Sequence, residues 1–107
     1  MKVLIYAGSE FMTGDDVAAA VMRYSEALAD AQTAATVEIP VVAPSGIRTT
    51  ATLLLGPASQ IVAADAEVAD DLSDPDVVSR LDGLTRSLHP TAIVETEPRT
   101  EPWEQEF

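Results

Sequence analysis

The stretch that decides the fold is VLIYAGSEFMTGDDVAAA at residues 3–20, where an apolar segment leads through a short polar segment into an amphipathic one. The continuous apolar run at residues 2–7, KVLIYA, predicts a strand buried on both faces. Residues 8–12 are expected to form a loop. Together these features predict a strand, a loop and a helix in succession.

The helix that follows has clear start signals. Thr13 is a candidate N-cap, and Asp16, three residues later, completes a capping box. The helix is expected to continue to about Gln32, because apolar residues recur at three- and four-residue steps on one face. These residues are Val17, Ala20, Val21, Tyr24, Leu28 and Ala31.

The middle of the chain predicts strands. Apolar and polar residues alternate over residues 36–41, where Pro40 indicates an edge position or a strand end. APSG at residues 43–46 predicts a turn, and residues 48–55, RTTATLLL, predict the returning strand of a hairpin. Residues 61–64 predict a further short strand.

A second helix is expected after the acidic stretch at residues 65–76. Ser73 or Asp74 can cap it, with Pro75 inside its first turn. Gly83 costs about 1 kcal/mol relative to Ala within a helix and could shorten or break it. His89, the only histidine, is expected to end this helix in a structural role, and residues 91–95 could add a last strand.

The element order is strand-helix-strand-strand-(strand)-helix-(strand). It predicts a small α+β fold, in which one or two helices pack on one face of a mostly antiparallel sheet. With 107 residues, we expect a single domain over residues 1–95 and an acidic C-terminal tail over residues 96–107.

The net charge of −12 is concentrated in two segments. Residues 65–76 carry six carboxylates and no base, and residues 95–107 carry five against one Arg. This charge disfavours direct binding to nucleic acid or to an anionic membrane surface, and favours a basic protein partner.

The chain has no Cys, so a disulfide framework is excluded and no metal or cofactor is expected. A cytoplasmic location and a GC-rich bacterial source are expected from the composition and the short apolar N-terminal run.

One possible binding site is the junction at residues 8–16, where a strand, a polar loop and a helix N-terminus make a generic anion site. It is similar to the phosphate loop of flavodoxins, in which a strand also runs into a Thr-Gly turn that opens a helix. Asp15 and Asp16 depart from that pattern, since carboxylates in the first turn would repel a phosphate. Helix capping is therefore favoured. The alternative is a small-ligand site or an enzyme, with Glu10, Thr13, Asp15 and Asp16 as its site residues.

The acidic stretch invites comparison with a calcium-binding EF-hand loop. Asp65, Glu67, Asp71 and Asp76 would fall on ligand positions, but Asp70 replaces the required glycine. A solvated acidic loop is the favoured interpretation.

Interaction residues are expected in the acidic stretch and in the tail. Trp103 and Phe107 lie four residues apart and would share one face of a helix, while Asp70 and Asp71 would present charge. The leading hypothesis is a non-catalytic protein–protein interaction module or a self-associating one. Dimerisation could use the exposed edge of the hairpin at residues 37–55. A third hypothesis is an acidic mimic of nucleic acid.

Overall fold

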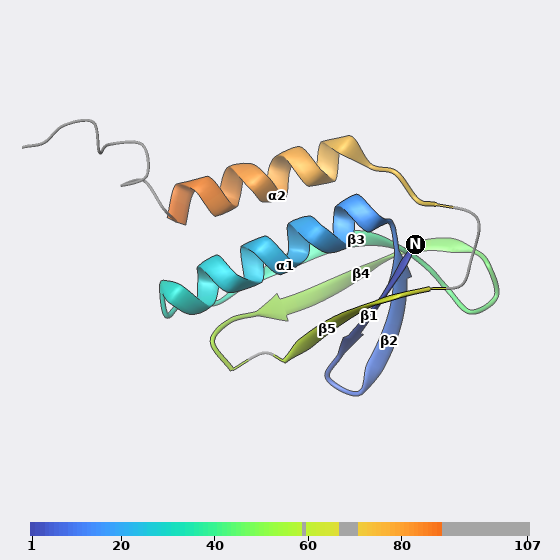
Figure 1. Ribbon diagram of the computed structural model, residues 1–107, viewed down its shortest axis with the longest axis horizontal. Helices are drawn as coiled ribbons and strands as arrows, with labels where there is room; N and C mark the ends of the chain where they lie inside the picture. Colours follow the sequence, from blue (N-terminus) through green and yellow to red (C-terminus); the bar gives the residue numbers. More distant parts are fainter. Residues whose placement is uncertain (59, 67–70, 89–107) are drawn as a thin grey trace, which may run out of the picture.

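The computed structural model describes residues 1–58, 60–66 and 71–88. Its elements are β1 (Lys2–Tyr6), β2 (Ser9–Thr13), α1 (Asp15–Asp30), β3 (Ala35–Val42), β4 (Arg48–Leu55), β5 (Ile61–Asp65) and α2 (Pro75–Leu88) (Figure 1). The strands form one antiparallel sheet in the order β4-β3-β2-β1-β5, which confirms the expected α+β class. Several predicted features lie outside the described residues, namely the strand at 91–95, the tail at 96–107, Asp70, His89, Trp103 and Phe107.

The segment after β1 was predicted wrongly, because residues 9–12 of the loop expected at residues 8–12 form a strand. They belong to β2, which pairs with β1 from Tyr6↔Ser9 to Lys2↔Thr13. Ala7 and Gly8 form the two-residue connection, and both have positive φ angles, 51° and 81°. Such a turn matches the twist of a hairpin. The usual sequence signal, Asn or Asp before Gly, is missing here because Ala7 takes the first position.

The predicted capping box at the start of α1 is also wrong. The N-cap is Gly14, which has no side-chain cap, and Thr13 is instead the fully buried last residue of β2. The hydroxyl of Thr13 donates a hydrogen bond of 2.7 Å to the carbonyl of Pro40. The predicted apolar face is confirmed up to Leu28, but α1 ends at Asp30 and Ala31 is exposed.

The hairpin of β3 and β4 is confirmed in full, with Val37 opposite Leu53 and a turn in which the Gly46 N–H donates to the Ala43 carbonyl. The position of Pro40 differs from the prediction, because it lies inside β3, and β3 is not an edge strand. A proline is tolerated there because β3 pairs with β2 only at Met12↔Val42.

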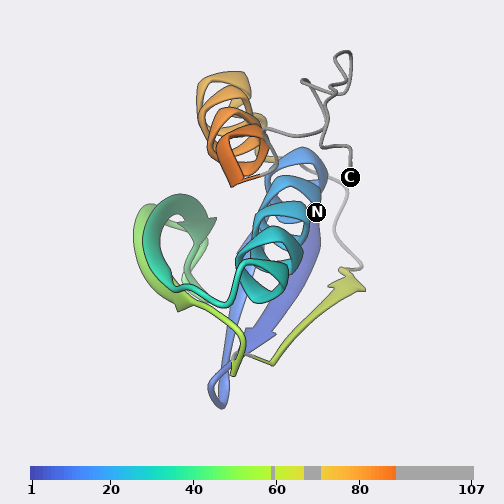
Figure 2. The same cartoon turned by 90° about the vertical axis from the view of Figure 1, so that its left-hand side faces the viewer.

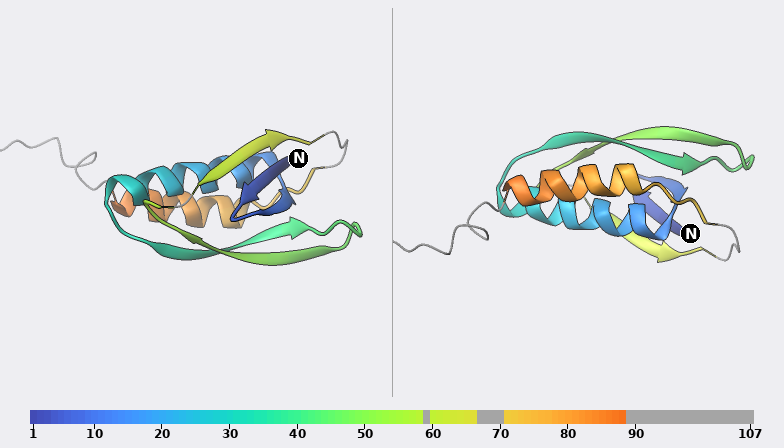
Figure 3. Two further views of the ribbon diagram at one scale, coloured as in Figure 1. Left: turned by 90° about the horizontal axis from the view of Figure 1, so that it is seen from below. Right: turned by 90° about the horizontal axis from the view of Figure 1, so that it is seen from above.

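Both helices lie on one face of the sheet, which curves around α1 (Figure 2). Helix α2 lies alongside α1 (Figure 3). It has one fully buried side chain, Leu81. Asp74 caps α2, as expected, through a bond from the Val77 N–H, and the helix continues through Gly83 without a break. Within the described residues, neither helix is long and apolar enough to cross a bilayer.

The core lies between α1 and the inner face of the sheet. Its fully buried large aliphatic side chains come from five of the seven elements, β1, α1, β3, β4 and α2, so these elements share one core. They are Leu4, Val17, Val21, Leu28, Ile39, Leu53, Leu55 and Leu81.

Candidate functional site

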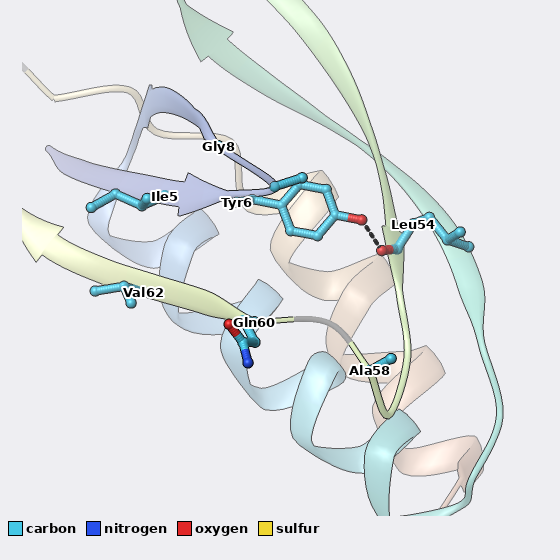
Figure 4. A pocket seen from close by; sticks show the side chains of 8 residues that line it. Ile5, Tyr6, Gly8, Leu54, Ala58, Gln60 and Val62 are labelled. Carbon is cyan, nitrogen blue, oxygen red and sulfur yellow. Dashed lines mark hydrogen bonds between the residues drawn. The ribbon is translucent and has the colours of Figure 1, made fainter.

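The sheet divides into two parts because β2 and β3 pair at a single position. One part holds β2, β1 and β5, and the other holds the β3–β4 hairpin. At the far end, the hydroxyl of Tyr6 on β1 bridges the two parts by donating a hydrogen bond to the carbonyl of Leu54 on β4 (Figure 4). A depression of about 520 Å³ lies around this bridge. Its lining is Ile5, Tyr6, Ala7, Gly8, Leu54, Ala58, Gln60 and Val62.

Beside this depression, the outer face of the first part is apolar apart from Glu10, which lies opposite Ile5. Leu4 points inward and is fully buried, so its neighbours on β1 point outward, away from the helices. The β1 register places Ile5 opposite Val62 and Val3 opposite both Met12 and Ala64. We name this set of five side chains the open apolar face: Val3, Ile5, Met12, Val62 and Ala64.

The prediction that β1 is buried on both sides is wrong. Its inner side is buried beneath α1, whereas Ile5 is 37% exposed and Val62 on β5 is 55% exposed. Leu54, across the depression, is 56% exposed. Soluble monomers seldom leave several large apolar side chains exposed together without a functional reason. The surface is therefore suited to contact with another apolar surface.

The four residues of the alternative ligand site do not converge. Glu10 lies on the outer face of β2 opposite Ile5, near the hairpin turn. Asp15 and Asp16 are exposed in the first turn of α1, beyond the opposite end of β2. Thr13 is buried and hydrogen bonded to Pro40. Within residues 1–58, 60–66 and 71–88, no three acidic or histidine side chains are grouped so that they could hold a metal ion.

Asp71 has a structural role that the sequence does not reveal. Its carboxylate accepts a hydrogen bond of 3.3 Å from the Asp15 N–H, and the amino group of Met1 lies 3.1 Å from Asp15 Oδ1 and 3.5 Å from Asp71 Oδ1. Desolvation raises the pKa of Asp71, but the N–H groups of Asp15 and Leu72 and the Met1 charge outweigh it, so the pKa is lowered. The hydrogen bond to Asp15 raises the pKa of the Met1 amino group. These contacts fasten the segment before α2 to the start of α1.

The first carboxylate of the acidic stretch is also paired. Lys2 on β1 forms a hydrogen-bonded ion pair with Asp65 on β5, opposite it in the register. The ion pair raises the pKa of Lys2 and lowers the pKa of Asp65. Asp65 therefore stabilises the contact of β5 with β1.

Electrostatic contacts also fix α2 in place. The guanidinium of Arg23 on α1 binds Asp82 on α2 at 3.0 Å, and Arg80 donates to the carbonyl of Glu38 on β3. These acids and bases hold elements together.

Comparison of this chain with family models, with characterised proteins and with solved structures found no match.

Proposed function

We propose that this protein is a non-catalytic interaction module that self-associates and thereby covers its open apolar face. The observation that carries the proposal is the exposure of Ile5 and Val62 on neighbouring strands, next to a depression lined mainly by apolar groups. Strand β1 is apolar on both sides, and the two helices cover only one of them. A second apolar surface would complete its burial.

The energetics indicate what such an association needs. Fully burying a Val or Ile side chain contributes roughly 1.5–3 kcal/mol, and less here because Ile5 and Val62 are already partly buried. Bringing two molecules together costs about 4–15 kcal/mol. Apolar contact alone therefore supports only weak association, and a stable complex needs further contacts such as backbone hydrogen bonds.

A basic protein partner is the second candidate, and the observation that favours it is the net charge of −12. The two candidates respond to salt in opposite ways. Salt screens the attraction between an acidic protein and a basic one, whereas it relieves the repulsion between two copies of the same acidic chain. Association that strengthens with salt favours self-association.

The proposal is tested by light scattering during size-exclusion chromatography, with Ile5→Asp placing a charge in the open apolar face. Thr50→Asp is the matched control, because Thr50 is exposed on β4 outside that face. The parent chain is expected to exceed its monomer mass of 11.3 kDa in 0.5 M salt. The Ile5 variant should elute as a monomer, and the Thr50 variant should behave like the parent chain.

Circular dichroism should show that both variants are folded. The proposal is contradicted if the parent chain remains a monomer at millimolar concentration in high salt. It is also contradicted if Ile5→Asp associates as strongly as the parent chain.

A further inference from the structure

Strand β5 ends the sheet on the side of the open apolar face. The direction of its backbone groups follows from one hydrogen bond. The Ala66 N–H donates to the Met1 carbonyl at 3.2 Å, and these two residues stand opposite each other in the continued β1–β5 register. Hydrogen-bonded pairs alternate along an antiparallel ladder, so Ala64 and Val62 also bond to β1.

The residues between them direct their backbone groups away from β1. They are Ile61, Ala63 and Asp65, and they are spaced evenly about Ala63. A rotation of 180° about an axis through Ala63 places these outward backbone groups opposite those of a second copy. The edge of β5 can therefore pair with the β5 edge of another molecule. An interface of this kind presents the same surface from both molecules, as in most homodimers.

We infer that two copies of this chain associate by antiparallel pairing of β5 with β5, which joins two five-stranded sheets into one. The inference rests on the proposed function and names its geometry. Ala63 lies opposite Ala63 of the partner subunit, and Ile61 lies opposite Asp65 of the partner subunit. Each of these pairs exchanges two backbone hydrogen bonds, which supply the contacts that the apolar face alone does not.

The side chains of Val62, Ala63 and Ala64 fit this arrangement. On the outer face, Val62 lies opposite Ala64 of the partner subunit in a pair without hydrogen bonds, where side chains approach most closely. Ile5 adjoins Val62 within each copy, so the open apolar faces become continuous across the interface. At the two-fold axis the residue is Ala63, whose small side chain leaves room for its counterpart.

Residues 61–64 of β5 also lack the devices that usually prevent such pairing. Edge strands are commonly protected by proline, by lysine or by inward-pointing charge. Residues 61–64 contain none of these, and the one charged residue of the strand, Asp65, is held by Lys2.

The opposite edge, β4, is less suited to pairing. The Ala43 N–H donates to the Ile47 carbonyl in the turn, and hydrogen-bonded pairs alternate from there along the β3–β4 ladder. Thr50, Thr52 and Leu54 therefore direct their backbone groups away from β3. The Leu54 carbonyl already accepts a hydrogen bond from Tyr6. The threonines are polar, so pairing at β4 would not extend the open apolar face.

The inference is tested by Ala63→Pro, which removes an outward N–H without affecting the β1 ladder. Thr52→Pro is the matched control, because it removes an outward N–H from β4. In 0.5 M salt, Ala63→Pro is expected to weaken dimerisation at least ten-fold by sedimentation equilibrium, whereas Thr52→Pro should leave it unchanged. Lowering the salt should weaken the parent dimer, since each copy carries a charge of −12.

Cross-linking supplies a second readout that does not depend on a proline. The chain has no Cys, so Ala63→Cys introduces a single thiol. A hydrogen-bonded pair places the two Cα atoms about 5.5 Å apart, within the range for a disulfide. Mild oxidation should give a covalent dimer with Ala63→Cys and not with Thr52→Cys.

The possible failures are distinguishable. A dimer that survives Ala63→Pro and that fails to cross-link at Ala63→Cys overturns β5 pairing, while sensitivity to Ile5→Asp would still support the proposed function. If Thr52→Pro abolishes the dimer and Ala63→Pro does not, the interface lies at β4 and the inference is overturned. A parent chain that is monomeric at every salt concentration overturns both.

Discussion

At the scale of single residues, Gly14 is the position where the fold tolerates no side chain. A Cβ built there would lie 1.7 Å from the carbonyl oxygen of Leu72, in the segment that leads into α2. Leu72 itself is buried, and the neighbouring Asp71 is bonded to the N–H of Asp15. A polar cap at Gly14 would therefore clash, which explains why α1 begins without one.

We expect Gly14→Ala to lower the free energy of unfolding by about 3 kcal/mol, because the backbone of Leu72 must move to admit the methyl group. Gly83→Ala is the matched control. A Cβ at Gly83 meets only the Arg86 guanidinium at 3.9 Å, so this change should stabilise the protein by roughly 0.5–1 kcal/mol. Urea unfolding measures both changes, and equal effects would contradict the packing described at Gly14.

At the scale of elements, the sequence predicts those whose signals are local. The periodic apolar face of α1, the turn at residues 43–46 and the Asp74-Pro75 start of α2 each depend on neighbouring residues, and each is confirmed. Strand β2 was missed because Ala7 adopts a positive φ angle that its side chain disfavours. The role of Thr13 was missed because its partner, Pro40, lies far along the chain.

The hydrogen bond from Tyr6 on β1 to Leu54 on β4 joins the two parts of the sheet and can be tested directly. Tyr6→Phe removes the hydrogen bond to Leu54 and should lower the free energy of unfolding by about 1 kcal/mol. Amide exchange near the C-terminal end of β4 should accelerate, because the hairpin loses a tie to β1. Tyr24→Phe is the control, and unchanged exchange in the Tyr6 variant would show that the bridge does not hold the hairpin.

At the scale of the whole molecule, acid should loosen contacts between distant segments. Asp65 and Asp71 both have lowered pKa values in the folded protein. Their stabilising effect is therefore present above the unfolded pKa of about 4, and it is lost as the pH falls through the lower folded values. The melting temperature should fall steadily below about pH 4.

Asp71→Asn should reduce the melting temperature at pH 7 and flatten part of this acid dependence, since the amide keeps the shape but loses the charge. Asp16→Asn is the matched control, because Asp16 is exposed in the same turn that contains Asp15. Calorimetry between pH 2.5 and 7 measures the slopes. Identical slopes for Asp71→Asn and the parent chain would exclude a contribution of the Asp71 contacts to acid stability.

The proposed interface belongs to this scale, and the sequence alone could not supply it. The apolar run of β1 indicated that both of its sides need cover, but the uncovered side depends on the sheet order and on where α1 packs. The sequence suggested an exposed edge of the hairpin at residues 37–55, whereas the pairing edge proposed here is β5. The pairing of β5 with β1 decides which residues of β5 direct their backbone groups away from β1, and this pairing is known only from the structure.

The most direct measurement is the molecular mass of the parent chain and of Ala63→Pro in 0.5 M salt, by sedimentation equilibrium. The account predicts twice the 11.3 kDa monomer mass for the parent chain, and for the variant at the same concentration a mass shifted toward that of the monomer, as at least ten-fold weaker dimerisation requires. A parent chain of monomer mass, or a variant that remains dimeric, would contradict it.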